Sequence, residues 1–257
     1  MRRSVAIAVV APTLFVAVLL AGWEIACRAF AVPEYFLPTP SAIALALVGN
    51  APLLFVSAWR TLSTSLMAFA ITGVLAGLAA LGAASARVAE ASFRPIAIAL
   101  QVTPIIAIAP LFTVWAGIDH PQVAVVALAC VAAFFPMYSG ALAGLSAADP
   151  ELERLFDLYG ATAWQRLTRL KLPSAVPQAM EGFKVGLGLA LVGAVIGEML
   201  AGSGDQQGLA FRILEASHRL QMAQSFAAVV ALGLMAGVLH AAFQALERRL
   251  IRWWRGR

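Results

Sequence analysis

Ionisable side chains are concentrated in one stretch of this 257-residue chain, between residues 146 and 176. The stretch carries charges of both signs, on Asp149, Glu151, Glu153, Arg154, Asp157, Arg166, Arg169 and Lys171. Charges so mixed suit either a folded surface that docks on another protein or a plain connector with a solvated face. The signals for helix ends decide between these two interpretations.

Those signals predict two short helices. Pro150 suits the first position of a helix that runs to about residue 159, and Gly160 breaks it. Thr162 and Gln165 have the spacing of a capping box, so a second helix begins there, and we expect it to end before Pro173. Connectors capped in this way usually dock on something, so we favour a docking helix–turn–helix.

Polar side chains inside apolar runs mark candidate contacts with a solute. Glu198 stands near the end of such a run, where an ionisable group is costly and usually faces a cavity or a partner. It is a candidate pathway or gate residue; the alternative is that it reaches the outer interface. Gln101, Thr103 and Thr113 lie in a run interrupted by prolines and are candidates for lining a pathway. Alternatively, this run is a kinked helix whose threonines bond their own carbonyls.

Two other features of the apolar runs have simpler interpretations. Glu181 and Lys184 are three residues apart on one helix face, so we expect them to pair with each other. Four glycines form two small-xxx-small pairs and are expected to pack against protein rather than solute: Gly182 with Gly186, and Gly193 with Gly197.

The sequence lacks the motifs for metal binding, ATP binding and nucleophilic catalysis. The three histidines and two cysteines have no metal-ligand spacing, so we expect no metal and no cofactor. Nothing resembles the Gly-x-x-x-x-Gly-Lys-Ser/Thr loop that holds ATP phosphates. The apolar runs also offer no Gly-x-Ser-x-Gly motif and no nucleophile with a matching histidine. We therefore expect that the chain is not an enzyme.

Composition defines the elements that must position these residues. The chain is 61% hydrophobic and only 12% charged. Five uncharged runs each reach the roughly 20 residues that cross a bilayer as a helix, namely 4–23, 61–86, 95–118, 120–148 and 220–246. These runs are apolar on every face, which excludes the alternating strands of a membrane β-barrel. The fold class predicted is an all-α polytopic membrane protein.

We expect six spans in one domain, residues 1–257, with a core at 58–246 and a polar loop at 146–176. The spans are placed at about 4–27, 60–84, 95–118, 121–145, 177–200 and 222–246. The proline-rich region 32–59 is expected at the outer surface, with a short helix capped by Ser41.

Basic residues set the orientation of these spans. Thirteen of them fall on the side of the termini and the 146–176 loop, against four on the other side, Arg28, Arg60, Arg212 and Arg219. The positive-inside rule then places both termini in the cytoplasm. The basic C-terminus, with Trp253 and Trp254, is expected to anchor on anionic lipid rather than on nucleic acid.

The polar loop resembles the loop signature of ABC importer permeases. Gly160 is followed after nine residues by Leu170-Lys171-Leu172-Pro173, which matches the back half of that signature. The front half departs, because Arg154-Leu155-Phe156 stands where the family has Glu-Ala-Ala; Glu151, Glu153 or Asp157 are candidate replacements for the family glutamate.

Other segments resemble the branch of this family that takes up nitrate, alkanesulfonates, taurine and thiamin- or riboflavin-related precursors. They follow in the order and spacing of that branch and span about residues 32–245: 37–41, 109–117, 134–136, 149–150, 172–177 and 197–199. The run 188–198 is slightly more similar to permeases for pyrimidine or flavin precursors than to those for sulfonates.

The resemblance implies a type I importer permease in the bacterial plasma (inner) membrane. A second copy, most simply an identical one, would complete the solute pathway. A cytoplasmic ATPase dimer would supply the energy, and an extracytoplasmic solute-binding protein would deliver the solute. The residues that match the coupling loop, and so are candidates for ATPase coupling, are Glu151, Glu153, Arg154, Asp157, Gly160, Leu172 and Pro173.

Two other functions compete with this one. A small dimeric secondary transporter would need more intramembrane carboxylates and a repeat between its halves, and neither is found. A substrate-capturing membrane subunit would be equally small but would not need the charged helical loop.

Overall fold

The computed structural model of the chain describes residues 2–85, 95, 98–99, 104–117, 120–201 and 207–255. Every regular element in these ranges is helical, so the predicted all-α class is confirmed. The elements are α1 (Arg2–Ala29), α2 (Pro40–Gly49), α3 (Ala51–Ser85), α5 (Ile105–Ala116), α6 (Pro121–Leu145), α7 (Pro150–Leu158), α8 (Ala163–Arg166), the π-helical turn η1 (Leu167–Lys171), α9 (Leu172–Ala201), α10 (Leu209–His218) and α11 (Met222–Arg255).

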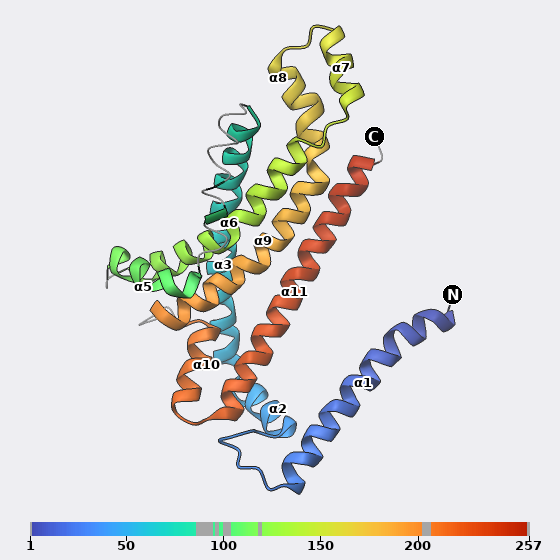
Figure 1. Cartoon of the computed structure of the whole chain (residues 1–257). Coiled ribbons are helices and arrows are strands. Elements are labelled where there is room, and N and C mark those ends of the chain that lie inside the picture. The colour runs from blue at the N-terminus through green and yellow to red at the C-terminus, as the bar shows by residue number, and fades with distance from the viewer. Residues whose placement is uncertain are drawn as a thin grey trace.

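Four long helices form the body of the molecule. α6 packs along both α9 and α3, and α11 packs against α9 and α3 (Figure 1). α7 and α8 project from one end of this bundle, near the C-terminal end of α11, while α2 and α10 lie at the other end (Figure 1). The polar loop and the predicted outer region are therefore at opposite ends of the bundle.

Small side chains let α3 approach its neighbours closely. From Ser57 onward its buried positions recur with the helical period and are occupied by alanine, serine or threonine, namely Ser57, Thr61, Thr64, Ser65, Ala68, Thr72, Ala76, Ala80 and Ala83. Small residues at a helix interface favour close backbone approach in membranes, where no hydrophobic effect drives helices together. The opposite face exposes large apolar side chains such as Phe55, Val74 and Leu78, as a lipid-facing surface does.

Glycines bring α6 and α9 into backbone contact. A Cβ on Gly182 would lie 2.5 Å from the Pro136 carbonyl oxygen, and a Cβ on Gly193 would lie 2.6 Å from the Ala129 Cα atom. Gly186 and Gly197 are equally crowded, by Met137 and Val125. All four glycines of the two small-xxx-small pairs thus face protein, as predicted.

Five described helices are long and apolar enough to cross a membrane, and they correspond to five of the six predicted spans. The third predicted span, 95–118, is not confirmed. Its described helix, α5, has only 12 residues, about 18 Å of helix against a bilayer core of about 30 Å. α5 begins after Pro104, whose backbone is extended. Most of residues 86–103 lie outside the described residues, so the span as a whole is not tested; within 104–117, the extended backbone of Pro104 breaks the run before α5.

The fifth span is longer than predicted. We expected the second loop helix to end before Pro173, but α8, η1 and α9 follow one another without a break from Ala163 to Ala201. In η1 the Leu172 amide donates to the Leu167 carbonyl, five residues back. This wide π-turn precedes the proline, whose missing N–H and ring would disturb a regular α-helix there. The loop arm is therefore a direct continuation of the membrane helix.

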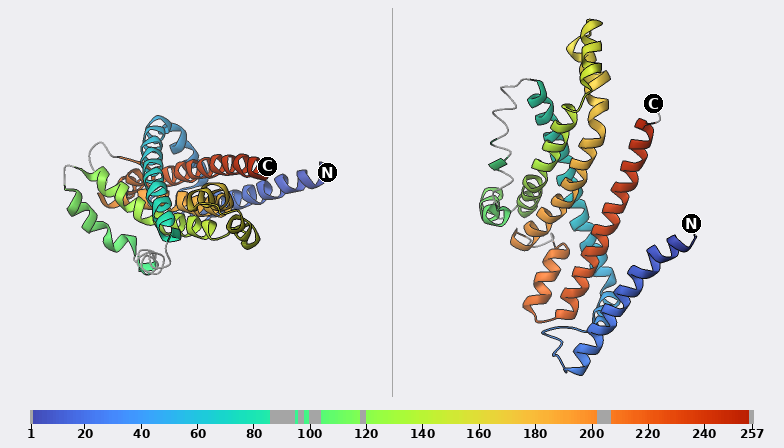
Figure 2. Two further views of the ribbon diagram at one scale, coloured as in Figure 1. Left: turned by 90° about the horizontal axis from the view of Figure 1, so that it is seen from above. Right: turned by 45° about the vertical axis from the view of Figure 1, so that its right-hand side comes forward.

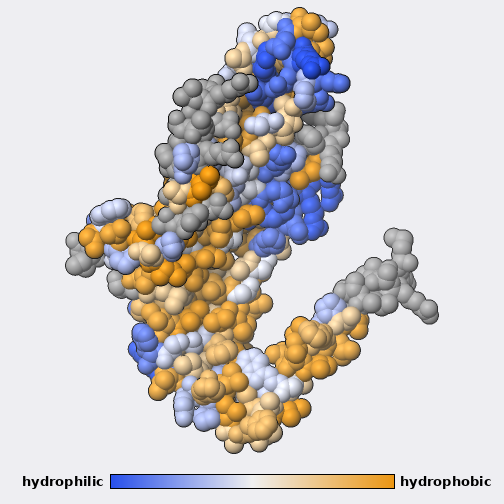
Figure 3. Space-filling view, in the orientation of Figure 1, coloured by the Kyte–Doolittle hydropathy of each residue, from blue (hydrophilic) through white to orange (hydrophobic). Residues whose placement is uncertain are grey.

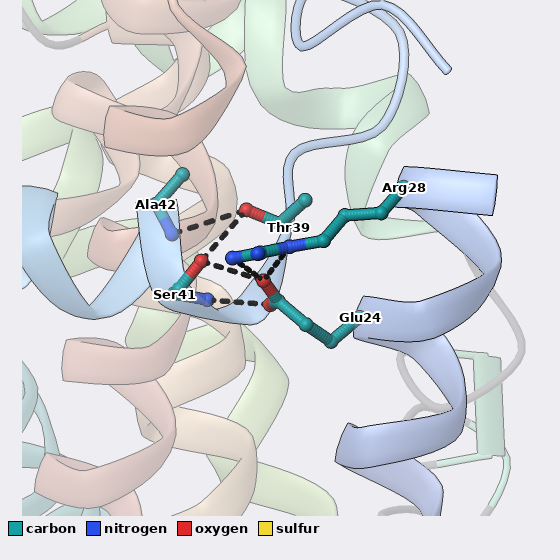
Figure 4. Close-up of polar contacts among 5 residues, drawn as sticks. All are labelled: Glu24, Arg28, Thr39, Ser41 and Ala42. Atoms are coloured by element: carbon teal, nitrogen blue, oxygen red, sulfur yellow. Dashed lines mark hydrogen bonds and ion pairs between the residues drawn. The ribbon is translucent and has the colours of Figure 1, made fainter. Parts of the chain in front are cut away.

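α1 is joined to the rest of the chain mainly through α2. The Glu24 carboxylate accepts hydrogen bonds from the backbone N–H of Ser41 at 3.0 Å and from its hydroxyl at 2.8 Å (Figure 4). Arg28 pairs with the same carboxylate. Thr39, rather than the predicted Ser41, caps α2, and its hydroxyl accepts from the Ala42 amide at 3.2 Å. Ser41 instead joins the two helices.

The distribution of surface polarity follows the bundle axis. On the face shown in Figure 3, hydrophilic residues gather over α7 and α8 and along the upper part of α11, and again beside α10. An apolar zone lies between them. The views of Figure 2 show α1 directed away from the body, and its side chains from Val10 to Leu20 are exposed.

Candidate functional site

The polar loop folds as the predicted helix–turn–helix. The Asp149 carboxylate caps α7 by accepting from the Glu151 amide at 2.8 Å. Thr162 and Gln165 form the complete capping box at the start of α8, with distances of 3.2 and 2.9 Å. Gly160 adopts a φ of +63° between the two helices, a conformation that residues with a Cβ rarely adopt.

Two ion pairs hold α7 against the arm formed by α8 and η1. Arg166 on the arm pairs with Asp157 of α7 at 2.5 Å. Lys171 pairs with Glu153 at 3.7 Å. Both pairs are partly exposed, so each contributes little by itself. Together with the caps, however, they fix the direction of α7 relative to the continuous helix that enters the membrane.

The end of this loop exposes large apolar side chains. Leu158 is 85% exposed, Tyr159 81% and Trp164 71%. Leu152 and Leu155 of α7 are also exposed. An exposed apolar group rimmed by charged residues is typical of a surface that binds another protein. These apolar residues were not singled out from the sequence, although their position beside the helix ends was visible there.

The predicted loop residues divide into two sets. Glu151, Glu153, Arg154 and Asp157 lie on α7 and Gly160 follows it, next to the exposed apolar end. Leu172 and Pro173 lie at the start of α9, beyond η1. These two therefore belong to the base of the arm rather than to its end.

Glu198 lies at the opposite end of the bundle and is only 4% exposed. Its Oε2 atom accepts from the Thr61 hydroxyl at 3.0 Å and from the Ala210 amide at 3.1 Å. The Leu209 amide donates to the same threonine at 2.9 Å. Leu209 and Ala210 begin α10, so a carboxylate from α9 caps another helix.

Sequence reasoning selected Glu198 but missed its surroundings. Thr61 belongs to the hydroxyl-bearing face of α3, whose helical spacing was the available signal. Gly208 packs on the carboxylate, since a Cβ there would overlap its oxygens. The alternative that Glu198 reaches the outer interface is not what the structure shows, because its side chain is enclosed by α3, α9 and α10.

Of the other three polar pathway candidates, the structure describes one. Thr113 donates to the Ala109 carbonyl of its own helix at 3.1 Å, as the kinked-helix alternative predicts. Gln101 and Thr103 lie outside the described residues.

A cavity lies elsewhere, along α6 and α9. It has a volume of ≈ 910 Å³ and lies beside Phe135, Pro136, Ser139 and Gly140 of α6 and Pro177, Gln178, Glu181 and Val185 of α9. Ile105 of α5 and Ile251 of α11 complete two of its edges. Neither Glu198 nor Thr113 lines it.

The expected pair of Glu181 and Lys184 is confirmed, and a third residue joins it. Lys184 Nζ lies 3.1 Å from Glu181 Oε1 and 2.9 Å from Glu247 Oε2. Glu247 is buried and comes from α11. This residue was missed because its charge lies in a C-terminal segment rich in arginine, which suggested a surface position.

The chain is similar to known transport proteins along most of its length. The family described as binding-protein-dependent transport system inner membrane component matches residues 70–256. The formylaminopyrimidine transport permease protein ThiX of Halalkalibacterium halodurans is 31% identical, over 94% of this chain and 95% of that protein. The riboflavin transport system permease protein RibX of Chloroflexus aurantiacus is 30% identical, over 91% and 87%. The taurine transport system permease protein TauC of Escherichia coli is 27% identical, over 92% and 87%.

Proposed function

The chain belongs to the family of binding-protein-dependent transport system inner membrane components, and from this premise we propose that two copies of it form the solute pathway of an ABC importer. As a permease subunit the chain is a multi-pass, non-catalytic component of the inner membrane. Transport of this kind requires an ATPase and a solute-binding protein. The second copy, its identity with the first and the arrangement of the pathway are parts of the proposal.

The exposed apolar end of the polar loop carries the proposal. Leu158, Tyr159 and Trp164 form a surface at the end of a capped, ion-paired lever. Because α8 continues through η1 into α9, a force applied to α7 passes directly into a membrane helix. We assign Glu151, Glu153, Arg154, Asp157 and Gly160 to contact with a cytoplasmic ATPase dimer, and Leu172 and Pro173 to the base of the lever.

Orientation follows from the same assignment. If the loop meets a cytoplasmic ATPase, the C-terminal end of α11, which lies at the same end of the bundle, is also cytoplasmic (Figure 1). The basic asymmetry of the sequence supports this direction for both termini. A reporter fused after Arg257 should be active in the cytoplasm; activity only on the outer side would reverse the proposed topology.

The proposed domain organisation is one transmembrane unit, with its core at 58–246 and its coupling loop at 146–176. The substrate is a small organic solute or anion. The relatives named for formylaminopyrimidine and riboflavin transport support a pyrimidine or flavin precursor before a sulfonate, taurine or nitrate. Within this proposal Gln101 and Thr103 remain pathway residues, whereas Glu198 acts as an outer structural latch.

Co-purification with the ATPase tests the function. The substitution Leu158→Ser should reduce ATPase recovered with the tagged permease, because it removes an apolar contact from the docking surface. Phe36→Ser changes another highly exposed apolar residue, in the turn between α1 and α2, and should leave recovery unchanged. Solute uptake that continues without any associated ATPase would instead favour a secondary transporter.

A further inference from the structure

The cavity between α6 and α9 has the size of a small-molecule site. Its volume of ≈ 910 Å³ falls within the roughly 300–1,000 Å³ usual for such sites. Phe135, Val185 and the prolines supply apolar walls, and Ser139, Gln178 and Glu181 supply polar groups. A mostly apolar site with few polar groups suits a compact ring-bearing solute better than a highly hydrated ion.

The one ionisable residue in the described lining of this cavity is a carboxylate. Glu181 lines it and its side chain is 66% exposed. Its partner Lys184 is shared with Glu247, so two carboxylates face one ammonium and the ionised cluster carries a formal charge of −1. Among the described residues that line the cavity there is no lysine or arginine. Arg248, about one turn before the lining residue Ile251 on α11, bonds Gln244 of the same helix.

The backbone adds hydrogen-bond acceptors rather than donors. Pro136 has no N–H to bond the Ala132 carbonyl one helical turn earlier, and both residues line the cavity. Ser139 and Gln178 can donate or accept. A sulfonate or nitrate would need several donors or a cation, which the described wall does not offer.

We propose that this cavity accommodates an amine-bearing or cationic aromatic solute and disfavours small anions. The ring would contact Phe135, and its N–H groups would bond Glu181, Gln178 and the Ala132 carbonyl. The assignment rests on the proposed function, because it takes the face between α6 and α9 as part of the solute pathway. It goes further by giving the chemical class that the permease itself prefers.

Paired thiol reagents of opposite charge test the sign of the field inside the cavity. The complex with its ATPase, in nanodiscs and without nucleotide, would carry Ser139→Cys on a background of Cys27→Ala and Cys130→Ser. The rate of labelling by the cationic aminoethyl methanethiosulfonate is divided by the rate for the anionic sulfonatoethyl methanethiosulfonate. That ratio is then divided by the ratio of the same two rates measured with free mercaptoethanol. This quotient cancels any change in the reactivity of the thiol itself.

We expect the normalised quotient to favour the cation by about tenfold, the size of one partly screened charge at short range. Glu181→Gln should lower the quotient to within about twofold of unity, because the remaining pair is neutral. Gln178→Glu should raise it. Glu34→Gln, a matched removal of an exposed carboxylate in the turn between α1 and α2, should leave it unchanged.

Occupancy supplies the second measurement. Aminopyrimidine at neutral pH should protect Ser139→Cys from labelling through its amine N–H groups, and benzenesulfonate should not. A quotient near unity, or one that Glu181→Gln and Gln178→Glu do not move in opposite directions, would overturn the inference, as would protection by benzenesulfonate alone. If the ATPase co-purifies but these results fail, only the substrate class is wrong; if the cation preference holds without ATPase association, the proposed function is wrong.

Discussion

The Glu198 carboxylate joins three helices that are far apart in the sequence. Gly208 is the N-cap residue of α10 and has no side chain to cap the helix, so the Glu198 carboxylate serves as the cap instead. A Cβ there would overlap the carboxylate, so any larger residue requires the buried Glu198 side chain to shift. The Thr61 hydroxyl bonds both the carboxylate and the Leu209 amide, and so connects α3 to the same junction.

This arrangement makes Glu198→Ala a destabilising substitution. It would leave the buried Ala210 amide without its acceptor, at a cost of about 1–3 kcal/mol, whereas the Thr61 hydroxyl can still donate to the Ser57 carbonyl at 3.3 Å. Thermal unfolding of the purified permease in detergent would measure the loss, with the exposed Glu34→Ala as control. Gly208→Ala should destabilise the wild type more than it destabilises Glu198→Ala, since its steric conflict is with the carboxylate. Simple additivity of the two substitutions would contradict the contact.

At this scale the sequence identifies unusual residues better than their partners. Glu198 stands out because a carboxylate in an apolar run demands an explanation. Nothing in the sequence pairs it with Thr61, which lies 137 positions away. Glu181 and Lys184 are adjacent on one helix and were paired correctly, whereas Glu247 meets them only through the packing of α11 on α9. Local pairs follow from helix geometry, but long-range pairs depend on the tertiary fold.

At the scale of helices, contact between α6 and α9 depends on the absence of side chains. Gly182→Ala would place a methyl group against the Pro136 carbonyl oxygen and so force the two backbones apart. Gly188 is in the same helix and has nothing within 4 Å of a Cβ. Gly188→Ala should stabilise the helix by up to about 1 kcal/mol, while Gly182→Ala should lower the unfolding temperature. Equal effects of the two alanines would show that the helices do not approach so closely.

Proline shows where sequence reasoning about elements succeeds and fails. Pro104 and Pro173 both disfavour the α-helical conformation of the residue that precedes them. The sequence alone therefore gives the two prolines the same expected effect on a helix. Pro104 lies in extended backbone before α5, whereas Pro173 lies within a helix that begins in the loop and crosses the bundle. The helix continues past Pro173 through the π-turn η1 that precedes it. No residue type in Leu167–Lys171 predicts such a turn. Hydropathy therefore locates apolar helices, but it does not tell a break from a continuation.

For the whole molecule, the continuous helix from Ala163 to Ala201 connects the two ends of the bundle. At one end it carries the exposed apolar loop, and at the other it carries Glu198 and the junction with α10. The cavity lies along the same helix, between these two ends. Movement of α7 therefore has a direct mechanical route to the cavity and to the junction with α10. In the proposed importer, ATPase closure would act through this helix rather than through a flexible loop.

Gly160 offers a test of this lever that leaves the bundle itself intact. Its φ of +63° strains any residue with a β-branched side chain, yet a Cβ there would meet nothing within 4 Å. Gly160→Val should therefore act through backbone strain, at a local cost of about 1–2 kcal/mol. The strain would redirect α7 and weaken its ion pairs with the arm. Gly160→Asn is the matched control, because asparagine tolerates the left-handed conformation.

The expected phenotype separates coupling from folding. Gly160→Val should be present in the membrane at a normal level, yet should lose ATPase association or retain it without coupling hydrolysis to uptake. Gly160→Asn should keep both, because its side chain fits the same turn and adds no steric conflict. Membrane abundance, ATPase co-purification and solute uptake would be measured in the same cells. Normal association and uptake in Gly160→Val would show that the loop is only a connector. The left-handed conformation of residue 160, which sets the direction of α7, would then not be needed for coupling.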